Sequence, residues 1–362
     1  MDIQYSSRVQ KIEAVLERWL PENPGPDWAR EVFSELEKIP DAQMLRGLTL
    51  PARDLLSRGG KRWRPLLMTL VCETLNGGDA ALPLAPLTEL CHNASLIHDD
   101  IEDNSDERRG RPAVHILYGV DTAVNSGSFL YFLPLSCVES WAAGLTLAAG
   151  IETLTSAVYS LWGAYMRRLH LGQSMDIAWH RDFSSLPDIE DYRVMCTLKT
   201  GCLARFSAVL GVYAAAAVNG AAAEQEKALA KLFGEAAENL GVGFQIIDDV
   251  KNLSEGMPGK KRGDDIVEGK KSLPVLMYLH RYPGQREFVS RCFAAARSDG
   301  AGAGEAEELI QAIDAAGILG EAREQGMELI SRARDAFGGV SANFPLREES
   351  RALLAALPDL LS

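Results

Sequence analysis

The stretch SLIHDDIEDNSDERRGRP, residues 95–112, holds the densest set of reactive side chains in the sequence. Four acids fall within five consecutive positions, and three arginines follow close behind. They are Asp99, Asp100, Glu102 and Asp103, and then Arg108, Arg109 and Arg111. Two interpretations are open at this point. The segment is either a solvated, highly charged loop, or its acids bind metal ions and its arginines bind the anion that those metals hold.

Spacing places several of these polar groups on one side of a helix. Asp99 and Asp103 are four residues apart, so on a helix their Cβ atoms lie about 5–6 Å apart on a shared face. At about 100° per residue, His92 and Ser95 lie within about 40° of Asp99. Such a polar strip lines a cavity or faces water, because a stripe facing the core would be apolar.

A second acidic motif, DDVKN, ends the apolar run GVGFQII at residues 241–252. Helical spacing puts Gly241, Gln245, Asp248 and Asn252 on one face. An acidic pair at the end of an apolar helix costs desolvation energy unless a cation neutralises it. Two such helix ends facing each other would form a cage of oxygen ligands. Magnesium binds in this way, through one or two carboxylates, waters and substrate phosphates.

Basic residues cluster although the 362-residue chain has a net charge of −13. That charge argues against a protein that coats nucleic acid, where affinity comes from neutralising phosphates. The clusters instead favour a local pocket for a small anion. They comprise Lys61, Arg62 and Arg64; Arg108, Arg109 and Arg111; and Lys260, Lys261, Arg262, Lys270 and Lys271. Each acidic motif alone is weak evidence, but two motifs, each followed by a basic cluster, favour a metal and anion site.

The periodicity of apolar residues predicts an all-α protein. Leu87, Leu90, Ala94, Ile97 and Ile101 recur at three- and four-residue steps and mark one helix face. We expect a single domain over residues 1–362, with a motif-bearing core at about 50–280 and C-terminal helices at about 305–362. Long helical segments are expected near 136–179, 190–218, 221–252 and 305–337, with loops at 254–265 and 298–304.

The cysteines and the apolar stretches indicate the compartment. The six cysteines show no paired spacing and lie in apolar surroundings, so we expect buried free thiols and a cytoplasmic protein. The N-terminus has no apolar signal region. The run at 141–166 is expected to be a buried core helix and not a transmembrane segment, because Glu152 interrupts it.

The motifs in combination resemble those of the trans-isoprenyl diphosphate synthase, or polyprenyl synthetase, family. GGKRWRP at 59–65, the acidic segment at 92–115, GQSMDIAW at 172–179, LKTG at 198–201 and the second acidic segment at 244–274 are all similar to family motifs. The first acidic segment, with VNSGSFLYF at 124–132, is most similar to geranylgeranyl diphosphate synthases of eukaryotic type. The resemblance implies a helical bundle around a deep cavity and a homodimer that binds isopentenyl diphosphate and an allylic prenyl diphosphate.

The resemblance also implies roles for individual residues. Asp99, Asp103 and Asp248 would bind about three magnesium ions, with Asp100 and Asp249 as further ligands or orienting waters. The allylic diphosphate would contact Arg108, Lys199, Thr200, Gln245, Lys261 and Lys270. Isopentenyl diphosphate would contact Gly60, Lys61, Arg64, His92 and Arg109. Asn252 stands where many members have a third aspartate, which leaves a carbonyl oxygen in its place.

The implied reaction is ionisation, condensation and elimination. The released diphosphate takes the final proton, so no dedicated protein base is required. We expect the loop at 254–262 to close over the diphosphates and bring in Lys261. The carbonyl dipoles at Lys199 and Thr200, together with the Gln245 amide, are expected to stabilise the allylic cation.

Product length depends on the side chains beside the growing chain. Ala94 and Ser95 are small where bulk stops elongation early in this family, which argues against a C15 product. Tyr131 and Phe132 resemble an aromatic floor and favour C20, although both are equally consistent with plain core aromatics. Ser156 is small where some relatives are bulkier, so C25 or longer stays open.

Two other classes are weighed against the synthase. A class I terpene cyclase shares the fold and the first acidic motif, but GGKRWRP points to a second diphosphate substrate. A non-catalytic subunit of a synthase typically loses an acidic motif, and both are present here. The sequence favours the synthase, with no transmembrane segment and no nucleic-acid partner.

Overall fold

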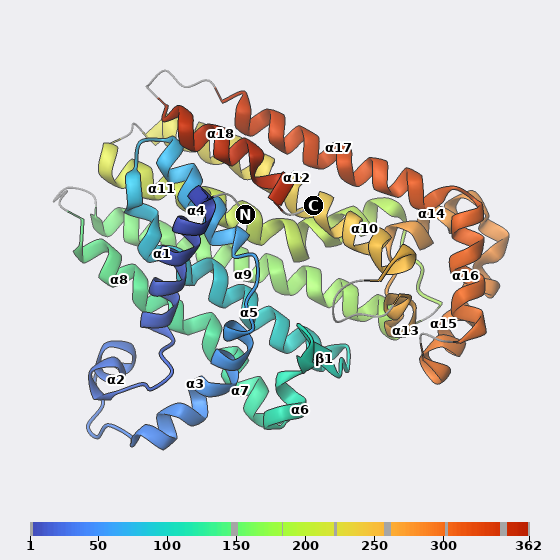
Figure 1. Cartoon of the computed structure of the whole chain (residues 1–362), viewed down its shortest axis with the longest axis horizontal. Helices are drawn as coiled ribbons and strands as arrows, with labels where there is room; N and C mark the ends of the chain where they lie inside the picture. The colour runs from blue at the N-terminus through green and yellow to red at the C-terminus, as the bar shows by residue number, and fades with distance from the viewer. Residues whose placement is uncertain are drawn as a thin grey trace. The chain divides into compact units, whose positions relative to one another are not determined.

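The computed structural model describes residues 3–145, 151–182, 184–220, 223–256, 262–300, 303–340 and 346–360. The protein is all-α, as predicted (Figure 1). It divides into two compact units, each built from separate stretches of chain. The first contains Met1–Ala164, Arg205–Gly234 and Ala336–Ser362, and the second contains Tyr165–Ala204 and Glu235–Asp335. The single domain expected from the sequence stays a prediction.

The first unit contains the first acidic motif and the GGKRWRP segment. Its helices are α1 (Ile3–Trp19), α2 (Pro26–Phe33), α3 (Ala42–Ser57), α4 (Trp63–Thr74), the 3₁₀ helix η1 (Gly78–Leu84), α5 (Ala85–Glu102), α6 (Val114–Tyr118), α7 (Val120–Phe132), the 3₁₀ helix η2 (Leu133–Leu135), α8 (Ser136–Ala143), α18 (Glu348–Ala356) and the 3₁₀ helix η5 (Leu357–Leu360). Parts of α9 (Ile151–Arg181), α11 (Cys202–Asn219), α12 (Ala223–Ser254) and α17 (Ile318–Gly338) complete it.

Helix α5 is the central element of the first unit and packs against α1, α3, α4 and α7. Pro86 lies in its first turn, where a missing N–H costs nothing. Leu87, Leu90, Ala94 and Ile97 are completely buried, which confirms the apolar face read from the sequence. Their burial fixes the rotation of the helix, so the polar face at its C-terminal end is turned away from this core.

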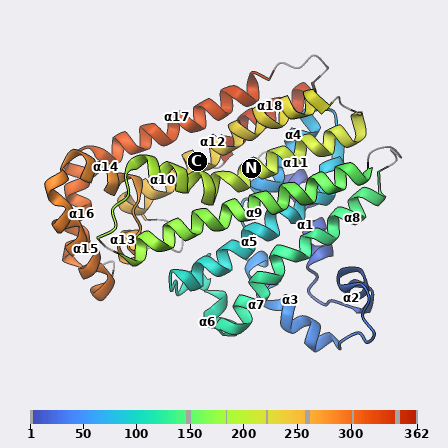
Figure 2. The same cartoon turned by 180° about the vertical axis from the view of Figure 1, so that it is seen from behind.

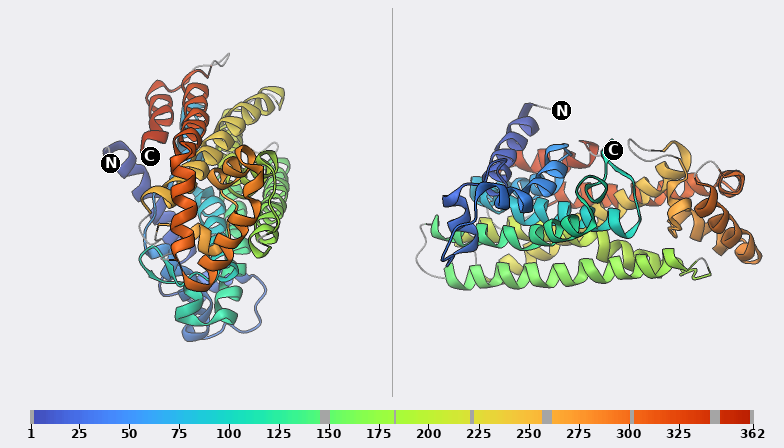
Figure 3. Two further views of the ribbon diagram at one scale, coloured as in Figure 1. Left: turned by 90° about the vertical axis from the view of Figure 1, so that its right-hand side faces the viewer. Right: turned by 90° about the horizontal axis from the view of Figure 1, so that it is seen from below.

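The first α-helix and the last α-helix contact each other in this unit. Helices α1 and α18 lie close together in Figure 3, and the Tyr5 hydroxyl of α1 donates to the Leu353 carbonyl of α18 at 2.5 Å. Arg8 pairs with the buried Glu73 of α4, which also accepts from the Ser350 hydroxyl of α18 at 2.8 Å. The N-terminal helix is therefore an integrated part of the unit.

Within the described residues, one small hairpin departs from the helical fold. Strands β1 (Glu107–Arg108) and β2 (Arg111–Pro112) pair antiparallel, with Arg108 opposite Arg111. Both turn residues have positive φ, 54° at Arg109 and 72° at Gly110. Two left-handed residues in succession define the tight turn that best matches strand twist. The hairpin turns the chain back immediately after the first acidic motif.

The second unit contains the second acidic motif on α12. Its other elements are parts of α9 and α17, α10 (Ile189–Cys196), the π-helical turn η3 (Thr197–Gly201), α13 (Asp264–Glu268), α14 (Leu273–Arg281), the 3₁₀ helix η4 (Pro283–Gln285), α15 (Arg286–Asp299) and α16 (Gly304–Ala315). Its core includes the fully or almost fully buried Leu253, Ile266, Leu273 and Phe293. This core holds the second acidic segment in place from both of its ends.

Two of the predicted long helices are wrong, because each is a pair of helices. Helix α8 ends at Ala143 and α9 begins at Ile151, whereas one helix was expected over 136–179. Figure 2 shows α9 as one long helix separate from α8. Helices α16 and α17 meet at Gly317, where φ is 73°, a left-handed conformation that ends a helix. The core helix expected at 141–166 is wrong for the same reason.

The other sequence expectations can be compared directly. All six cysteines are free and buried, as predicted. Among the described residues, the segment Ile189–Asn219 is long and apolar enough to cross a membrane, but 78% of its most apolar window is buried inside the protein. A core helix has the same properties. Of the expected loop at 254–265, residues 257–261 lie outside the described residues, and α13 begins at Asp264.

Candidate active site

The first acidic motif lies where α5 ends. Asn104 follows the helix with φ of 54°, and the Ser105 N–H donates to the Asp100 carbonyl at 2.9 Å. This is the hydrogen bond that closes a Schellman motif. The turn leaves Asp99 and Asp103 partly exposed and buries Asp100 completely. The C-terminal end of the helix therefore leaves Asp99 and Asp103 accessible, whereas Asp100 is buried.

Arg108 connects the hairpin to these acids. Its Nε donates to Asp100 Oδ1 at 2.7 Å, and its Nη2 lies 3.4 Å from Asp99 Oδ2. Burial raises the pKa of Asp100, while the Arg108 charge acts in the opposite direction. One guanidinium thus holds two neighbouring carboxylates. A cation placed here attracts an anion that approaches the exposed acids through a metal.

A second basic group surrounds His92 on the same helix. Burial lowers the pKa of His92 well below its usual value, and the charges of Arg64 and Arg109 lower it further. The imidazole is therefore neutral at pH 7. Arg64 is buried, with its guanidinium 4.5 Å from the Trp63 ring centroid. Arg109 donates to the carbonyls of Leu55 and Gly59, while Gly60 and Lys61 are exposed.

The second acidic motif repeats the pattern of the first. Asp248 is exposed and Asp249 is buried. Both oxygens of Asp249 accept hydrogen bonds, Oδ1 from Gln245 at 3.0 Å and Oδ2 from Tyr192 at 2.7 Å and from the Leu273 N–H at 3.0 Å. Burial raises the pKa of Asp249 to about 7, and the charge of Asp265 adds to the shift. Asp249 is held by the protein, and Asp248 faces outward.

A π-helical turn brings a threonine to this network. The Thr200 hydroxyl donates to Gln245 Oε1 at 2.9 Å, so Thr200, Gln245 and Asp249 form a continuous chain of hydrogen bonds. The turn at Thr197–Gly201 is π-helical, and such π bulges are frequent at functional sites. Gly241 permits the approach, because a Cβ there would lie 3.0 Å from Gly201 Cα.

Lys199, from the same turn, has an acidic partner that the sequence interpretation missed. Its Nζ donates to Asp176 Oδ2 at 2.6 Å, and Asp176 is only 5% exposed. Asp176 lies within GQSMDIAW, a motif recognised in the sequence without a role for its acid. A Cβ at Gly172 would lie 2.4 Å from the Lys199 N–H nitrogen. The motif therefore supplies both the counter-charge and the space that this lysine needs.

The segment after the second motif contributes further charges. Lys270 Nζ lies 2.6 Å from Glu268 Oε2. The Asn252 side-chain oxygen accepts from the Asp265 N–H at 3.2 Å, so the residue in place of a third aspartate contacts the first turn of α13. Lys271 is buried and donates to the carbonyls of Trp179 and Gly269 at 3.0 and 2.7 Å. Lys261 lies outside the described residues.

The five proposed chain-length residues differ in exposure. Ala94 is completely buried and Ser95 is partly buried, with its hydroxyl donating to the His92 carbonyl at 2.8 Å. Tyr131 is buried and stacks on His98 with ring centroids 5.7 Å apart. Phe132 is 61% exposed and its ring lies against Trp162, and Ser156 is exposed. The roles of all five stay predictions.

The donor set fits a hard divalent cation. Among the described residues, no group of three His, Cys, Asp or Glu side chains is arranged to hold a metal ion by itself. Magnesium needs only one or two carboxylates when phosphate and water oxygens complete its coordination. The buried Oδ2 of Asp100 has no hydrogen-bond partner. The first acidic motif therefore has a carboxylate oxygen next to Asp99 that no protein donor occupies. The acids therefore suit a metal that binds together with a phosphate ligand.

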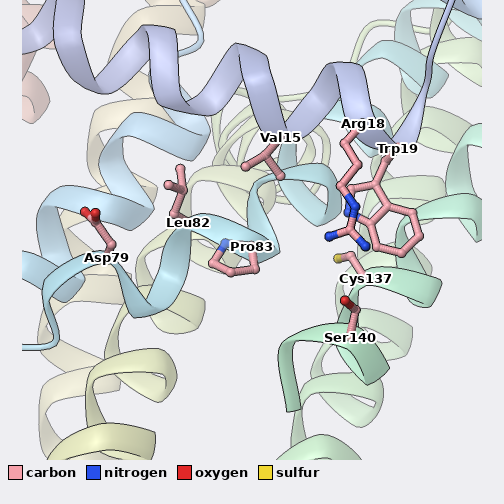
Figure 4. A pocket seen from close by; sticks show the side chains of 8 residues that line it. All are labelled: Val15, Arg18, Trp19, Asp79, Leu82, Pro83, Cys137 and Ser140. Atoms are coloured by element: carbon pink, nitrogen blue, oxygen red, sulfur yellow. The ribbon is translucent and has the colours of Figure 1, made fainter. Parts of the chain in front are cut away.

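A small pocket in the first unit lies apart from these residues. It has a volume of about 270 Å³ and is formed by α1, η1 and α8 (Figure 4). Its walls are Val15, Arg18, Trp19, Asp79, Leu82, Pro83, Cys137 and Ser140. None of the predicted site residues lines it. The pocket contains neither an acidic pair nor a basic cluster, and we assign it no part in the chemistry.

The chain is similar to known proteins over much of its length. The polyprenyl synthetase family model matches residues 46–313. A geranylfarnesyl diphosphate synthase from Aeropyrum pernix is 33% identical over 316 residues, which cover 85% of this chain and 91% of that protein. The chloroplastic geranylgeranyl pyrophosphate synthase 3 of Arabidopsis thaliana is 35% identical over 62% of this chain and 61% of that protein.

The fold agrees as well. The crystal structure of geranylgeranyl pyrophosphate synthetase from Pyrococcus horikoshii Ot3 superposes with a TM-score of 0.77 at 26% identity. The superposition covers 99% of this chain and 96% of that chain. The match of the family model, the length of the aligned relatives and the all-α architecture lead to one conclusion. The chain belongs to the polyprenyl synthetase family of trans-prenyltransferases.

Proposed function

We propose that the protein condenses isopentenyl diphosphate head to tail (1′–4) with an allylic diphosphate, releases diphosphate and makes geranylgeranyl diphosphate, a C20 product. The observation that carries the proposal is the repeated pattern of the two acidic motifs. In each, the first aspartate is more accessible than the second: Asp99 is partly exposed and Asp248 exposed, whereas Asp100 and Asp249 are buried. A metal-dependent synthase needs accessible carboxylates that are held rigidly by their neighbours.

The partly or fully exposed aspartates of the two motifs are the proposed metal ligands. Asp99, Asp103 and Asp248 would bind about three magnesium ions together with the diphosphate oxygens. When bound, magnesium supplies Lewis-acid stabilisation of the charge on the leaving diphosphate. Asp100 and Asp249 orient their neighbours, because Arg108 holds the first and three protein donors hold the second.

The basic side chains hold the substrates. Arg108, Lys199, Lys261 and Lys270 bind the allylic diphosphate in this proposal, with Thr200 and Gln245 beside it. Gly60, Lys61, Arg64, His92 and Arg109 bind isopentenyl diphosphate. A neutral His92 fits beside four arginines, since a protonated imidazole would be repelled there. The carbonyls of the π-helical turn stabilise the allylic cation, and the released diphosphate takes the final proton.

Product analysis tests this function. The purified protein is incubated with magnesium, isopentenyl diphosphate and, separately, dimethylallyl, geranyl and farnesyl diphosphates, and the dephosphorylated alcohols are sized. A predominant C20 alcohol is the expected result. The absence of condensation with every primer, in a folded protein, would overturn the proposal in favour of a cyclase or a non-catalytic subunit. Cyclisation without isopentenyl diphosphate would identify the cyclase.

A C25 product is the second candidate. The relative from Aeropyrum pernix is named a geranylfarnesyl diphosphate synthase, and its alignment covers most of both chains. Ser156, the small residue that left longer products open, is exposed. A C25 alcohol in the same assay would keep the enzyme class and replace only the chain-length assignment.

We also propose that the protein is a cytoplasmic homodimer. Helices α6 and α7 expose Ile116, Leu117, Val120 and Val124, each at least 42% accessible. Neighbouring apolar side chains of this kind mark a protein–protein interface. Burial of all six cysteine thiols suits a reducing compartment. Sedimentation velocity is expected to give a dimer, and a Val120→Lys, Val124→Lys double variant is expected to shift it to monomer. A monomeric wild type would contradict the assignment.

A further inference from the structure

Arg62, which follows Lys61 in the GGKRWRP segment, has no place among the proposed substrate ligands, yet several protein groups hold its side chain. Its side chain is 1% exposed. Nε donates to Glu13 at 2.7 Å, Nη1 to Glu89 at 2.8 Å, and Nη2 to the Leu56 carbonyl at 2.6 Å. A buried guanidinium with every nitrogen engaged has a fixed position and cannot turn outward to bind a substrate.

Arg62 holds the backbone of the Gly59–Gly60 loop, called the glycine loop below. Its Nη1 also donates to the Gly59 carbonyl at 3.1 Å, and Arg109 donates to the same carbonyl. Arg62 itself has φ of 47° and Arg109 has φ of 54°. Left-handed backbone at a residue other than glycine costs about 1 kcal/mol or more and persists only where the surroundings enforce it. Two arginines in this conformation therefore fix one carbonyl, that of Gly59.

The strained conformation of Arg62 sets the direction of its neighbours. Arg62 is the residue that precedes α4, so its backbone determines how the exposed Lys61 leaves the loop and where Arg64 lies in the first turn of the helix. Gly60 packs against both guanidiniums, since a Cβ there would lie 3.2 Å from each of Arg62 and Arg109. Arg62 therefore fixes the positions of the loop, of Lys61 and of Arg64 together.

Two acids, Glu89 and Glu13, neutralise the charge of Arg62. Glu89 is 3% exposed, lies on α5 one turn before His92, and also accepts from Asn93 Nδ2 at 3.1 Å. Glu13 comes from α1, and its side chain is 44% exposed. Glu13 joins the N-terminal helix to the glycine loop through Arg62. Because Glu13 is half exposed, its removal leaves Arg62 with its buried partner Glu89 and does not create an unpaired buried charge.

We propose that Glu13 of the N-terminal helix and Arg62 are positioning residues for isopentenyl diphosphate, because they fix the Gly59–Gly60 loop that presents Lys61 and Arg64. This assignment rests on the proposed function and adds to it two residues that touch neither substrate. It gives α1 a part in substrate binding. The expected consequence is a selective loss of affinity for isopentenyl diphosphate when the Glu13 contact is weakened.

Direct binding tests the proposal without requiring turnover. Isothermal titration of isopentenyl diphosphate alone, in the presence of magnesium, is compared for wild type, Glu13→Gln and Glu13→Ala. Loss of one partly exposed charged contact is expected to raise Kd about two- to fivefold. The Glu13→Gln variant is expected to lose less affinity for isopentenyl diphosphate than the Glu13→Ala variant. The reason is that the glutamine amide oxygen can still accept a hydrogen bond from Arg62 Nε. Steady-state kinetics should show the same rise in KM for isopentenyl diphosphate, with kcat and KM for the allylic substrate unchanged.

Glu17→Gln is the matched control. Glu17 lies one turn further along α1 and pairs with Arg53 at 2.9 Å, away from the glycine loop. The Glu13→Gln and Glu17→Gln variants are expected to have equal melting temperatures, and only the first should bind isopentenyl diphosphate more weakly. Arg62→Lys, which keeps the charge but loses the branched geometry, should weaken binding at least as much as Glu13→Ala.

The outcomes separate this proposal from the function on which it rests. A wild type that binds no isopentenyl diphosphate would overturn the proposed function. A wild type that binds it, with Glu13 variants of unchanged Kd and KM, would overturn the positioning role alone. Equal losses for isopentenyl and allylic diphosphates, or equal losses in the Glu17 control, would also contradict it, since a general effect on stability moves every substrate together.

Discussion

Tyr192 donates its phenolic hydrogen to Oδ2 of Asp249 across 2.7 Å, and both side chains are buried. Gln245 and the Leu273 N–H occupy the remaining acceptor positions of the carboxylate. An aspartate with both oxygens already engaged by protein donors is poorly placed to bind a metal directly. The second acidic motif therefore combines one outward-facing aspartate, Asp248, with one buried aspartate that the protein itself holds.

The first prediction concerns that anchor. Tyr192→Phe removes one donor from a buried carboxylate and is expected to lower the free energy of unfolding by about 1–3 kcal/mol. Urea denaturation at pH 8 measures it. Tyr159→Phe serves as the control, because the Tyr159 hydroxyl only reaches Glu139 at 3.4 Å near the surface. Equal stability of the two variants would show that the Tyr192 contact carries no special weight.

The second prediction separates the two aspartates of the first motif. Asp99→Asn is expected to raise the magnesium concentration for half-maximal activity about 10- to 100-fold, as loss of a metal ligand does. Asp100→Asn is expected to affect stability more, because Arg108 loses a buried partner. Magnesium titration of activity and thermal unfolding are measured for both. Glu102→Gln, in the same segment, is the control. A larger effect of Asp100→Asn on the magnesium requirement, with a larger effect of Asp99→Asn on stability, would contradict the assigned roles.

The third prediction tests the close approach beneath Lys199. Gly172→Ala places a Cβ 2.4 Å from the Lys199 backbone nitrogen, so α9 and the π-helical turn must move apart. We expect a loss of about 1–3 kcal/mol in stability together with a raised KM for the allylic substrate. Gly284→Ala, where no atom lies within 4 Å of the added Cβ, should change neither. An unchanged Gly172→Ala enzyme would show that the turn tolerates displacement.

The fourth prediction concerns pH and the buried Lys271. Burial lowers its pKa to about 8 from the usual 10.5. Below pH 8 both the folded and the unfolded protein carry the proton. Between about 8 and 10.5 the unfolded chain binds more protons, so this residue's contribution to the free energy of unfolding rises with pH.

The comparison with a variant isolates this contribution. Across that window, wild type should gain about 1–3 kcal/mol relative to Lys271→Met, measured by denaturation at several pH values. Lys11→Met, at a half-exposed lysine paired with Asp79, should show no such trend. A difference between wild type and Lys271→Met that stays constant from pH 8 to 10.5 would show that the Lys271 ammonium has its ordinary pKa.

The sequence was sufficient for the fold class and for placing the two acidic motifs near helix ends, because both follow from local patterns. Apolar spacing located α5 and its buried face. The breaks between α8 and α9 and at Gly317 were missed, since helical periodicity continues across them in sequence. Composition alone does not reveal a single left-handed glycine that changes the direction of the chain.

The partners of the site residues were harder to find. Asp176, Tyr192 and Glu13 are far in sequence from the lysine, aspartate and arginine that they contact. Such pairs depend on tertiary packing, and no local signal marks them. One physical argument was available, because a buried charged side chain requires a partner of opposite charge. A search for acids without an assigned role in the recognised motifs would have identified Asp176.

The last prediction concerns product length. Tyr131 is buried and stacks on His98, the residue before Asp99, whereas Phe132 is 61% exposed. A side chain that limits the growing chain has to be held inside the protein, so the two aromatics are expected to differ. Tyr131→Ala should shift the main product from C20 to C25 or longer with farnesyl diphosphate as primer, and Phe132→Ala should leave it at C20. Because removing a buried aromatic costs about 3–5 kcal/mol, Tyr131→Leu is assayed beside it as a milder variant. Longer products from the Phe132 variant alone would place the floor at the exposed residue and remove Tyr131 from the assignment.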